Sequence, residues 1–272
     1  MNIRLGIDIG GSTTKIIGLR NEKLIGTKQV RAADQLTALF GAIGSFLREY
    51  GASLDDVSDI TLTGVGASFV GNESLYGIKT HTVNEFQAIG HGARHLSGLQ
   101  NILVVSMGTG TAFVKATASG IVRIGGSGVG GGTIPGLASL MLEKRDIDAI
   151  IAMADGGDLN NVDLMVSDII GEEIPSLPSD LTAANFGNVK STASKSDIAL
   201  GIINMVFEVI GMLCVFAIKN ESINDVVLTG TLATFPQASR VFKRFSDMTG
   251  INFVIPPNAE FATALGTVFV ES

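Results

Sequence analysis

The chain has 272 residues, 46% of them hydrophobic, and a formal net charge of -7, so it can bury a sizeable core in one large domain or in two lobes. Binding to nucleic acid is disfavoured, because contacts with a phosphate backbone need clustered Lys and Arg, which this sequence lacks. The single cysteine, Cys214, excludes an internal disulfide framework and a cysteine-rich metal site within the chain, and a reducing cytoplasm fits this usage best.

No segment predicts attachment to a membrane. The opening MNIRLGIDIGGS has no long apolar stretch and no small-residue cleavage site. Residues 201–218 are the most apolar segment, but Asn204 and Glu208 interrupt it, and we therefore expect a buried helix there.

The first part of the chain predicts a strand meander followed by a helix. Apolar runs at 3–9, 14–20 and 23–30 are separated by Gly10-Gly11 and by Asn21-Glu22, which favours hairpins over a strand-helix crossover. Apolar residues at helical spacing then follow Asp34, a suitable cap, as far as Gly51. The remaining elements expected in this part are a strand at 59–63, a short strand near 79–83 and a helix from about 85 to 96.

The same order of elements starts again at residue 101, which indicates a duplicated architecture. The runs NILVVSMGTG, TAFVKAT and GIVRIGG predict a second meander at 101–126. Beyond it, the pattern predicts helices at 134–153, 161–170 and 195–219, a strand at 225–230, and a final helix, strand and helix. We expect an N-terminal lobe at 1–100 and a C-terminal lobe at 101–272 that contains a helical insertion.

The motif GIDIGGSTTK at 6–15 has the composition of a phosphate-binding turn. Two glycines let a phosphate approach the backbone N-H groups without meeting a Cβ atom, and the three hydroxyl residues after them add donors. Asp8, at the end of the strand, could hold a hydrated magnesium ion together with substrate phosphates. The alternative is an ordinary Gly-Gly hairpin with a solvated aspartate.

Two later motifs repeat parts of this pattern. SMGTGT at 106–111 repeats the turn at the corresponding place in the second half, and a pair of such turns across a cleft could hold different phosphates of one nucleotide. VVLTGT at 226–231 leads an apolar strand into Gly230, where the backbone can pass close to an adenosine. A strand that ends in a tight turn is the alternative for this third motif.

The segment GGSGVGGGT at 125–133 contains a formal GxGxxG match, but it does not predict a dinucleotide-binding fold. That fingerprint needs a strand, turn and helix that open a βαβ unit and an acidic residue at a later strand end. Here the segment follows a meander, and Glu143 and Asp146 fall in a predicted helical stretch. We expect instead a glycine loop that leads into a helix from Ile134, whose N-terminal N-H groups can take an anion.

Glu85 and Arg123 are the candidate catalytic residues. Glu85 lies where a short strand enters a helix and could accept a proton from a substrate hydroxyl, although an acidic residue that stabilises a helix N-terminus is the alternative. Arg123 could neutralise charge on a transferred phosphoryl group, or it could pair with a surface carboxylate. The three histidines, His81, His91 and His95, form no metal-ligand spacing.

With the three Gly/Thr turns in this order, the chain resembles the superfamily of actin, sugar kinases and heat-shock ATPases, and within it the type II pantothenate kinases. The residues that carry the resemblance are DIGGSTTK at 8–15, NEFQAIGHGA at 84–93, RIGGSGVGGGTIPGL at 123–137 and LPSDLTAANFGNV at 177–189. The resemblance implies an α/β, two-lobed, ribonuclease H-like (actin-like ATPase) fold. Each lobe would be a mixed sheet flanked by helices, with the nucleotide in the cleft between the lobes.

The resemblance also implies an activity. ATP, with Mg²⁺, would phosphorylate the primary hydroxyl of pantothenate, the first step towards coenzyme A, with Glu85 as the base and Arg123 as the active-site arginine. A cytoplasmic homodimer is implied, for which the helix at 198–218 is a candidate surface, and the question of regulation by coenzyme A thioesters arises. The nucleotide-binding positions are Asp8, Ile9, Gly10, Gly11, Ser12, Thr13, Thr14, Lys15, Thr109, Gly130, Gly131, Gly132, Thr133, Ile134 and Thr231.

Three alternatives stand beside this interpretation. The activator ATPase of radical dehydratases shares a similar first motif but needs cysteines for a cluster between subunits, and only Cys214 is present. An acetamido-sugar or hexose kinase of the same superfamily is compatible with the phosphate turns. A non-catalytic protein whose cleft closes on a nucleotide is the third alternative.

Overall fold

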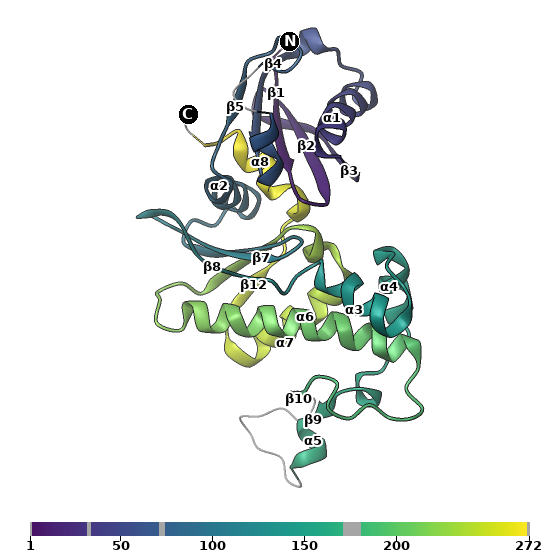
Figure 1. The fold of residues 1–272 in the computed structure, drawn as a ribbon. Coiled ribbons are helices and arrows are strands. Elements are labelled where there is room, and N and C mark those ends of the chain that lie inside the picture. Colours follow the sequence, from purple (N-terminus) through teal and green to yellow (C-terminus); the bar gives the residue numbers. More distant parts are fainter. Residues whose placement is uncertain (1, 32–33, 71–73, 171–180, 271–272) are drawn as a thin grey trace.

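The computed structural model describes residues 2–31, 34–70, 74–170 and 181–270, which form two five-stranded sheets with helices around them (Figure 1). The strand order is β3-β2-β1-β4-β5 in the first sheet and β8-β7-β6-β11-β12 in the second. The strands of the first sheet are β1 (Ile3–Ile9), β2 (Thr13–Arg20), β3 (Lys23–Arg31), β4 (Val57–Thr63) and β5 (Thr80–Thr82). Those of the second are β6 (Ile102–Met107), β7 (Thr111–Thr117), β8 (Gly120–Ser127), β11 (Asp225–Thr229) and β12 (Asn252–Val254).

The two sheets have the same topology. In each, three consecutive strands pair antiparallel as a meander, and the first strand then pairs in parallel with the fourth, which pairs in parallel with the fifth. The duplicated architecture and the fold class expected from the sequence are therefore confirmed. Because β1 and β6 occupy the same place in their sheets, the turns that follow them are structurally equivalent.

Helix α1 (Gln35–Glu49) covers one face of the first sheet. The side chain of Asp34 caps it by accepting a hydrogen bond from the N-H of Thr37 at 2.6 Å, as the sequence predicts. Its buried residues pack with the apolar side chains of β1 and β4, and Phe46 is fully buried between them. This core fixes the first sheet and the turn after β1.

The second sheet is covered on one face by α6 (Lys195–Ile218), together with α3 (Thr133–Leu142), α4 (Ile147–Ala154) and α7 (Pro236–Thr249). In Figure 1, α6 runs along the whole width of this sheet. By length and composition α6 could cross a membrane, but 61% of its most apolar window is buried inside the fold. The helix serves as the core of the larger lobe, in agreement with the expectation of a buried helix.

Helices α2 (Glu85–Ser97) and α8 (Ala262–Thr267) pack against each other between the two sheets. The contact is reciprocal and backbone-close. A Cβ on Gly92 would lie 1.8 Å from the carbonyl oxygen of Ala262, and one on Gly266 would lie 1.8 Å from that of Ala88. Glycine is therefore required at both positions, because any side chain would push the helices apart.

The packing of α8 departs from the lobe assignment made from the sequence. The strands of the two sheets divide on either side of residue 100, but α8 returns to the first sheet, where Ala264, Leu265 and Val268 pack with Ile17 and Leu19 of β2. The last segment of the chain thus belongs to the core of the N-terminal lobe. A single boundary at residue 100 does not describe this return.

Two predicted helices are wrong in detail. The helix expected at 134–153 is divided into α3 and α4, because Glu143 is left-handed with φ of 57° and the side chain of Asp146 caps a new helix at Ala149. The helix expected at 161–170 is replaced by β9 (Leu164–Met165) and the single turn α5 (Val166–Ile169). Here pairing of β9 with the distant β10 (Thr182–Ala184) overrides the local helical pattern.

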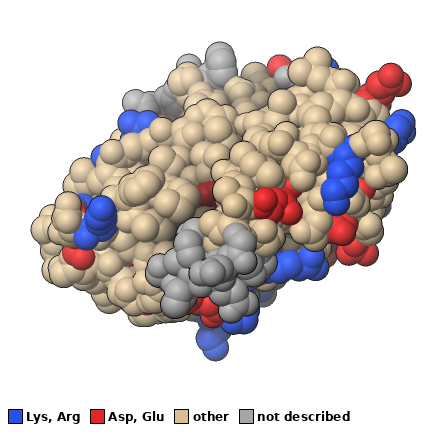
Figure 2. Space-filling view, turned by 90° about the horizontal axis from the view of Figure 1, so that it is seen from below, with Lys and Arg blue, Asp and Glu red and all other residues tan. Residues whose placement is uncertain are grey.

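The face below α6 carries few charges near its centre. Figure 2 shows Lys and Arg there as separate side chains towards the rim, with no continuous basic patch on the described part of this face.

Candidate functional site

A cavity of about 750 Å³ lies between the two lobes. It is lined by the turn after β1, the turn after β6, the start of α2, the glycine loop before α3 and the segment after β11. Clefts of this size commonly hold small molecules. The three Gly/Thr motifs recognised in the sequence therefore meet around one cavity.

The first turn places two charges at the floor of the cavity. In the register of β1 and β2, Asp8 lies opposite Lys15, and the turn between them is closed by a hydrogen bond from Gly10 N to Thr13 O of 3.0 Å. Only 6% of Lys15 is exposed, and its Nζ donates to Thr231 Oγ1 at 2.9 Å across the cleft. The lysine thus connects the first motif with the third.

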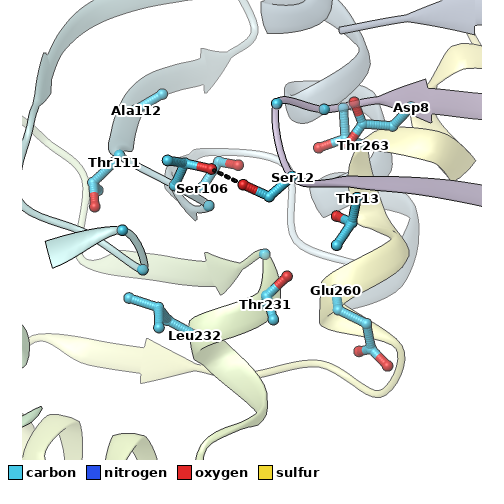
Figure 3. Close-up of a pocket in the computed structure, with 18 of the residues that line it drawn as sticks. Asp8, Ser12, Thr13, Ser106, Thr111, Ala112, Thr231, Leu232, Glu260 and Thr263 are labelled. Carbon is cyan, nitrogen blue, oxygen red and sulfur yellow. Dashed lines mark hydrogen bonds between the residues drawn. The ribbon is translucent and has the colours of Figure 1, made fainter. Parts of the chain in front are cut away.

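The second turn faces the first with neutral groups. Ser106 lies opposite Ala112 in the register of β6 and β7, where the first sheet has Asp8 and Lys15. Ser12 Oγ and Thr109 Oγ1 approach to 3.3 Å across the cleft, the contact dashed in Figure 3. Hydroxyl groups from both lobes therefore meet where a phosphate chain would pass between them.

The glycine loop supports the second turn through its backbone. Gly131 N and Gly132 N donate to the carbonyl oxygens of Gly108 and Thr109, each at 2.8 Å. A Cβ on Gly130 would lie 2.7 Å from the carbonyl carbon of Gly110, so the contact needs glycine. These N-H groups are already used. The donors of Gly131 and Gly132 therefore hold the second turn in shape, while the anion was expected at the N-H groups of the helix from Ile134, a prediction that these two hydrogen bonds do not test.

Burial shifts the pKa values of three charged side chains that line the cavity. Burial raises the pKa of Asp8 to about 7, Lys15 opposes this rise by its positive charge, and the negative charge of Glu85 adds to it. Burial also lowers the pKa of Lys15, against the attraction of Asp8 and Glu260. Burial raises the pKa of Glu85 as well. A cluster of perturbed charges in a cleft is typical of a functional site.

Glu85 is not needed as the cap of α2. Asn84 performs that role, because its Oδ1 accepts hydrogen bonds from Phe86 N at 2.9 Å and Gln87 N at 3.2 Å. The carboxylate of Glu85 lines the cavity instead. Glu85 is also the acidic residue in the first turn of α2, so stabilisation of the helix N-terminus stands beside its place in the cavity lining.

Arg123 also lines the cavity, from β8. It forms no hydrogen bond or ion pair with any residue that the structure describes, and its guanidinium carbon lies 5.2 Å from the centre of the Phe86 ring. The alternative in which Arg123 pairs with a surface carboxylate has no support among these residues.

The remaining predicted positions divide into two groups. The nucleotide-binding positions that line the cavity are Asp8, Gly10, Gly11, Ser12, Thr13, Lys15, Thr109, Gly131, Gly132 and Thr231. Those that lie beside it are Ile9, Thr14, Gly130, Thr133 and Ile134. Ile9 and Ile134 point into the cores of their lobes, and Thr133 Oγ1 accepts a hydrogen bond from Gly130 N at 3.0 Å.

Several lining residues were not predicted from the sequence. Glu260 and Thr263 reach the cavity because the chain returns to the first lobe at α8, and Figure 3 shows both near Thr13 and Asp8. Pro135, Ile147, Leu232 and Phe235 supply an apolar wall. Of these positions, only Pro135 lies in a motif quoted from the sequence, RIGGSGVGGGTIPGL at 123–137.

Residues 177–180 of the motif LPSDLTAANFGNV fall outside the described part of the chain, and its residues 181–189 do not line the cavity. Thr182 Oγ1 and Asn185 Nδ2 donate to the carboxylate of Glu208 on the outer side of α6, at 2.9 and 2.8 Å. Phe186 N donates to Asp163 Oδ1 at 2.8 Å. Thr182 and Asn185 therefore anchor the described part of the motif to α6.

A magnesium site can be tested against these side chains. Among the described residues, no group of three or more His, Cys, Asp or Glu side chains could hold a metal ion. Asp8 is a partly buried carboxylate that lines the cavity beside the two Gly/Thr turns. This arrangement fits Mg²⁺, which keeps several waters and is bound through one or two carboxylates and substrate phosphates.

Comparison with known proteins decides the family. The family model described as Fumble matches residues 49–240. The chain belongs to the Fumble family. The cavity described above is therefore a cavity of a Fumble-family protein.

The curated relatives match nearly the whole chain. A type II pantothenate kinase of Oceanobacillus iheyensis is 29% identical over 278 residues, covering 97% of this chain and 98% of the relative. A type II pantothenate kinase of Staphylococcus epidermidis is 27% identical and covers 98% of this chain and 100% of the relative. The resemblance stated from the sequence is confirmed.

Solved structures show the fold. Component A of the (R)-2-hydroxyglutaryl-CoA dehydratase of Acidaminococcus fermentans is 18% identical with a TM-score of 0.70, covering 98% of this chain and 96% of that chain. A ROK hexokinase from Thermus thermophilus is 15% identical with a TM-score of 0.56, covering 98% and 97%. Both confirm the two-lobed fold expected from the sequence.

Proposed function

We propose that this protein transfers the γ-phosphoryl group of ATP to the primary hydroxyl of pantothenate and so forms 4'-phosphopantothenate. The observation that carries the proposal is the placement of Glu85. This carboxylate lines the same cavity as two phosphate turns while Asn84 caps its helix. The names of the curated relatives support pantothenate as the acceptor.

The nucleotide would lie between the two turns. The phosphates would meet the first turn at residues 10–13, the side chain of Lys15 and the hydroxyl of Thr109. The adenine would pack on the apolar wall, next to Gly230 and Thr231. This order leaves the γ-phosphate on the side of the cavity where Glu85 and Arg123 lie.

Asp8 would hold Mg²⁺, most directly through a water of its hydration shell. When bound, the ion supplies positive charge against the phosphates. Burial raises the pKa of Asp8 to about 7, so the protein alone does not favour the charged form of this carboxyl. A bound cation would therefore stabilise the charged form of Asp8, as the positive charge of Lys15 already does.

Glu85 would act as the general base. It accepts the proton of the pantothenate hydroxyl as the oxygen forms its bond to the γ-phosphorus and the bond from that phosphorus to the β-phosphate oxygen breaks, releasing ADP. Burial raises its pKa, which makes it a stronger base than an exposed glutamate. Arg123 would stabilise the charge on the transferred phosphoryl group.

We also propose a cytoplasmic homodimer that uses the outer face of α6. Phe216 is 63% exposed and Met212, one turn before it on the same helix, is 39% exposed. Large apolar side chains exposed side by side favour an interface with a second copy. The buried Cys214 on the same helix fits a reducing compartment.

The experiment that tests the proposal measures ADP release by the purified protein with Mg²⁺-ATP. Pantothenate, glucose and N-acetylglucosamine are compared as acceptors at equal concentration. We expect release that depends on pantothenate and a product that is heavier by one phosphate group. Release that depends on a sugar and not on pantothenate would favour the sugar-kinase alternative, and nucleotide binding without any turnover would favour the non-catalytic one.

A further inference from the structure

The start of α2 and strand β8 form one unit on the wall of the cavity. Gln87 Nε2 donates to the carbonyl oxygen of Ile121 at 2.9 Å. One turn later, Gly90 lies so close to Ile121 that a Cβ there would be 2.6 Å from its Cγ2. These two contacts fix the distance between the helix that carries Glu85 and the strand that carries Arg123.

Within this unit, Arg123 is held by an aromatic ring. Its Cζ lies 5.2 Å from the centroid of Phe86, and both side chains line the cavity. On its own strand, a Cβ on Gly126 would lie 3.0 Å from Arg123 Nη2, so this glycine leaves room for the guanidinium. The guanidinium forms no hydrogen bond or ion pair with the described residues, and the ring is its principal contact.

A ring is suited to this task because it holds a cation without occupying its donors. A carboxylate partner would neutralise the guanidinium and compete with a phosphoryl group for its N-H groups. The face of an aromatic ring attracts the cation while the N-H groups at the edge of the guanidinium remain available. Arg123 over Phe86 is therefore both positioned and chemically free.

We propose that Phe86 is the positioning residue for Arg123 in phosphoryl transfer. The residue next to the base thus sets the direction of the arginine, so the start of α2 carries the base and orients the arginine of β8. This inference rests on the proposed function, in which Arg123 stabilises the transferred group. Phe86 acts through Arg123 and not by accepting or donating a proton.

A double-mutant cycle on turnover tests the proposal. We expect Phe86→Leu to lower kcat by about 2- to 30-fold, the range that a cation-π contact supports, with little change in the KM for ATP. In an Arg123→Met background the same change should cost less than about 2-fold, because the contact is already lost. Phe86→Tyr, which keeps the ring, should restore most of kcat.

The matched control is Phe40→Leu, on α1. Phe40 is also half-exposed and packs edge-on against another ring, that of Tyr76, but it does not line the cavity. Its replacement should leave kcat unchanged. Equal losses from Phe86→Leu in the wild-type and Arg123→Met backgrounds would overturn the proposal, as would full turnover of Arg123→Met or of Phe86→Leu.

A second measurement does not depend on activity. The chain has no tryptophan, so Phe86→Trp introduces a single indole fluorophore at this position. If the guanidinium covers one face of the ring, adding Arg123→Ala to this variant should increase the quenching of its indole emission by acrylamide, a neutral quencher. An unchanged quenching constant would contradict the contact itself.

The two measurements separate the possible failures. If wild-type protein does not turn over pantothenate but the quenching responds to Arg123→Ala, the proposed acceptor is wrong and the contact stands. In that case the cycle is repeated with the acceptor that supports ADP release. If pantothenate is turned over but the cycle shows no coupling, the proposed function stands and Phe86 has no positioning role.

Discussion

The turns after β1 and β6 occupy the same place in two sheets of identical topology, yet they carry different chemistry. In the first sheet Asp8 lies opposite Lys15, and in the second Ser106 lies opposite Ala112. One turn thus brings a buried pair of charges to the cavity, and its equivalent brings a hydroxyl and a methyl group.

The difference shows how a duplicated frame can be divided between two tasks. Burial raises the pKa of Asp8 and lowers that of Lys15, so the first turn holds its charges at a cost in stability. The second turn has no such cost, because Ser106 and Ala112 carry no charge. Its shape is fixed by backbone hydrogen bonds from Gly131 and Gly132. We infer that the first turn handles the charge of the phosphates and the magnesium ion, and that the second turn positions them.

The largest expected effect comes from replacing the polar side chain beside each turn, Asp8 in the first sheet and Ser106 in the second. Asp8→Asn should lower kcat/KM by about 10²- to 10³-fold, because a charge that stabilises the transferring group is lost. Ser106→Ala should lower it by less than about 10-fold, because only a neutral hydrogen bond is removed. Steady-state ADP release measures both, and losses of similar size would contradict the division of tasks.

The reciprocal contact of α2 and α8 can be tested next, through stability. Gly92→Ala and Gly266→Ala should each lower the free energy of unfolding by about 1–3 kcal/mol or more, because each Cβ would meet a backbone carbonyl oxygen 1.8 Å away. The measurement is urea denaturation followed by circular dichroism. A loss at only one of the two positions would show that the contact is not reciprocal.

The matched control for these glycines is Gly41 on α1, where a Cβ would have nothing within 4 Å. Gly41→Ala should raise the free energy of unfolding by about 0.5–1 kcal/mol, the difference in helix propensity between the two residues.

The pH profile of turnover distinguishes the titrating side chains of Asp8 and Glu85 from the neutral side chain of Ser106. Asp8 and Glu85 must be ionised to act, and burial raises the pKa of both. Activity should therefore fall as the pH is lowered through the raised pKa of the Glu85 carboxyl. Ser106→Ala should keep the same acid limb, because it removes no titrating group. A profile that is flat between about pH 5 and 8 would contradict the assignment.

The smallest expected effect is on the pH dependence of stability. The pKa of Asp8 is about 7 in the folded chain and near 3.8 when unfolded, so between these values the folded state binds more protons. Stability contributed by this group therefore decreases as the pH rises from about 4 to 7. Asp8→Asn removes the titration, and its Tm relative to wild type should be a few degrees higher at about pH 8 than at about pH 5.5. The same difference at both pH values would show that Asp8 does not titrate in this range.

Much of the fold could be predicted because its signals are local. Gly10-Gly11 and Asn21-Glu22 mark the turns of the first meander, and Asp34 marks the start of α1 by capping it. The repeated order of apolar strand and Gly/Thr turn revealed the second sheet. Each of these features depends on residues within a few positions of one another, which is the information that a single sequence carries.

What could not be predicted depends on contacts between distant residues. Residues 164–165 form a strand only because residues 182–184 pair with them. Glu260 and Thr263 line the cavity because α8 returns to the first sheet. The glycine loop was expected to lead into a helix, but the support that Gly131 N and Gly132 N give to the second turn was not predicted. The contact between Phe86 and Arg123 also joins segments with no common motif.

The central claim is that Glu85 takes the proton of the pantothenate hydroxyl in a cleft built to hold ATP. The most direct test is Glu85→Gln, which keeps the size of the side chain and removes its basicity. We predict that this variant binds Mg²⁺-ATP with unchanged affinity but forms phosphopantothenate about 10²- to 10⁴-fold more slowly than wild type. Formation of phosphopantothenate at the wild-type rate would contradict the account.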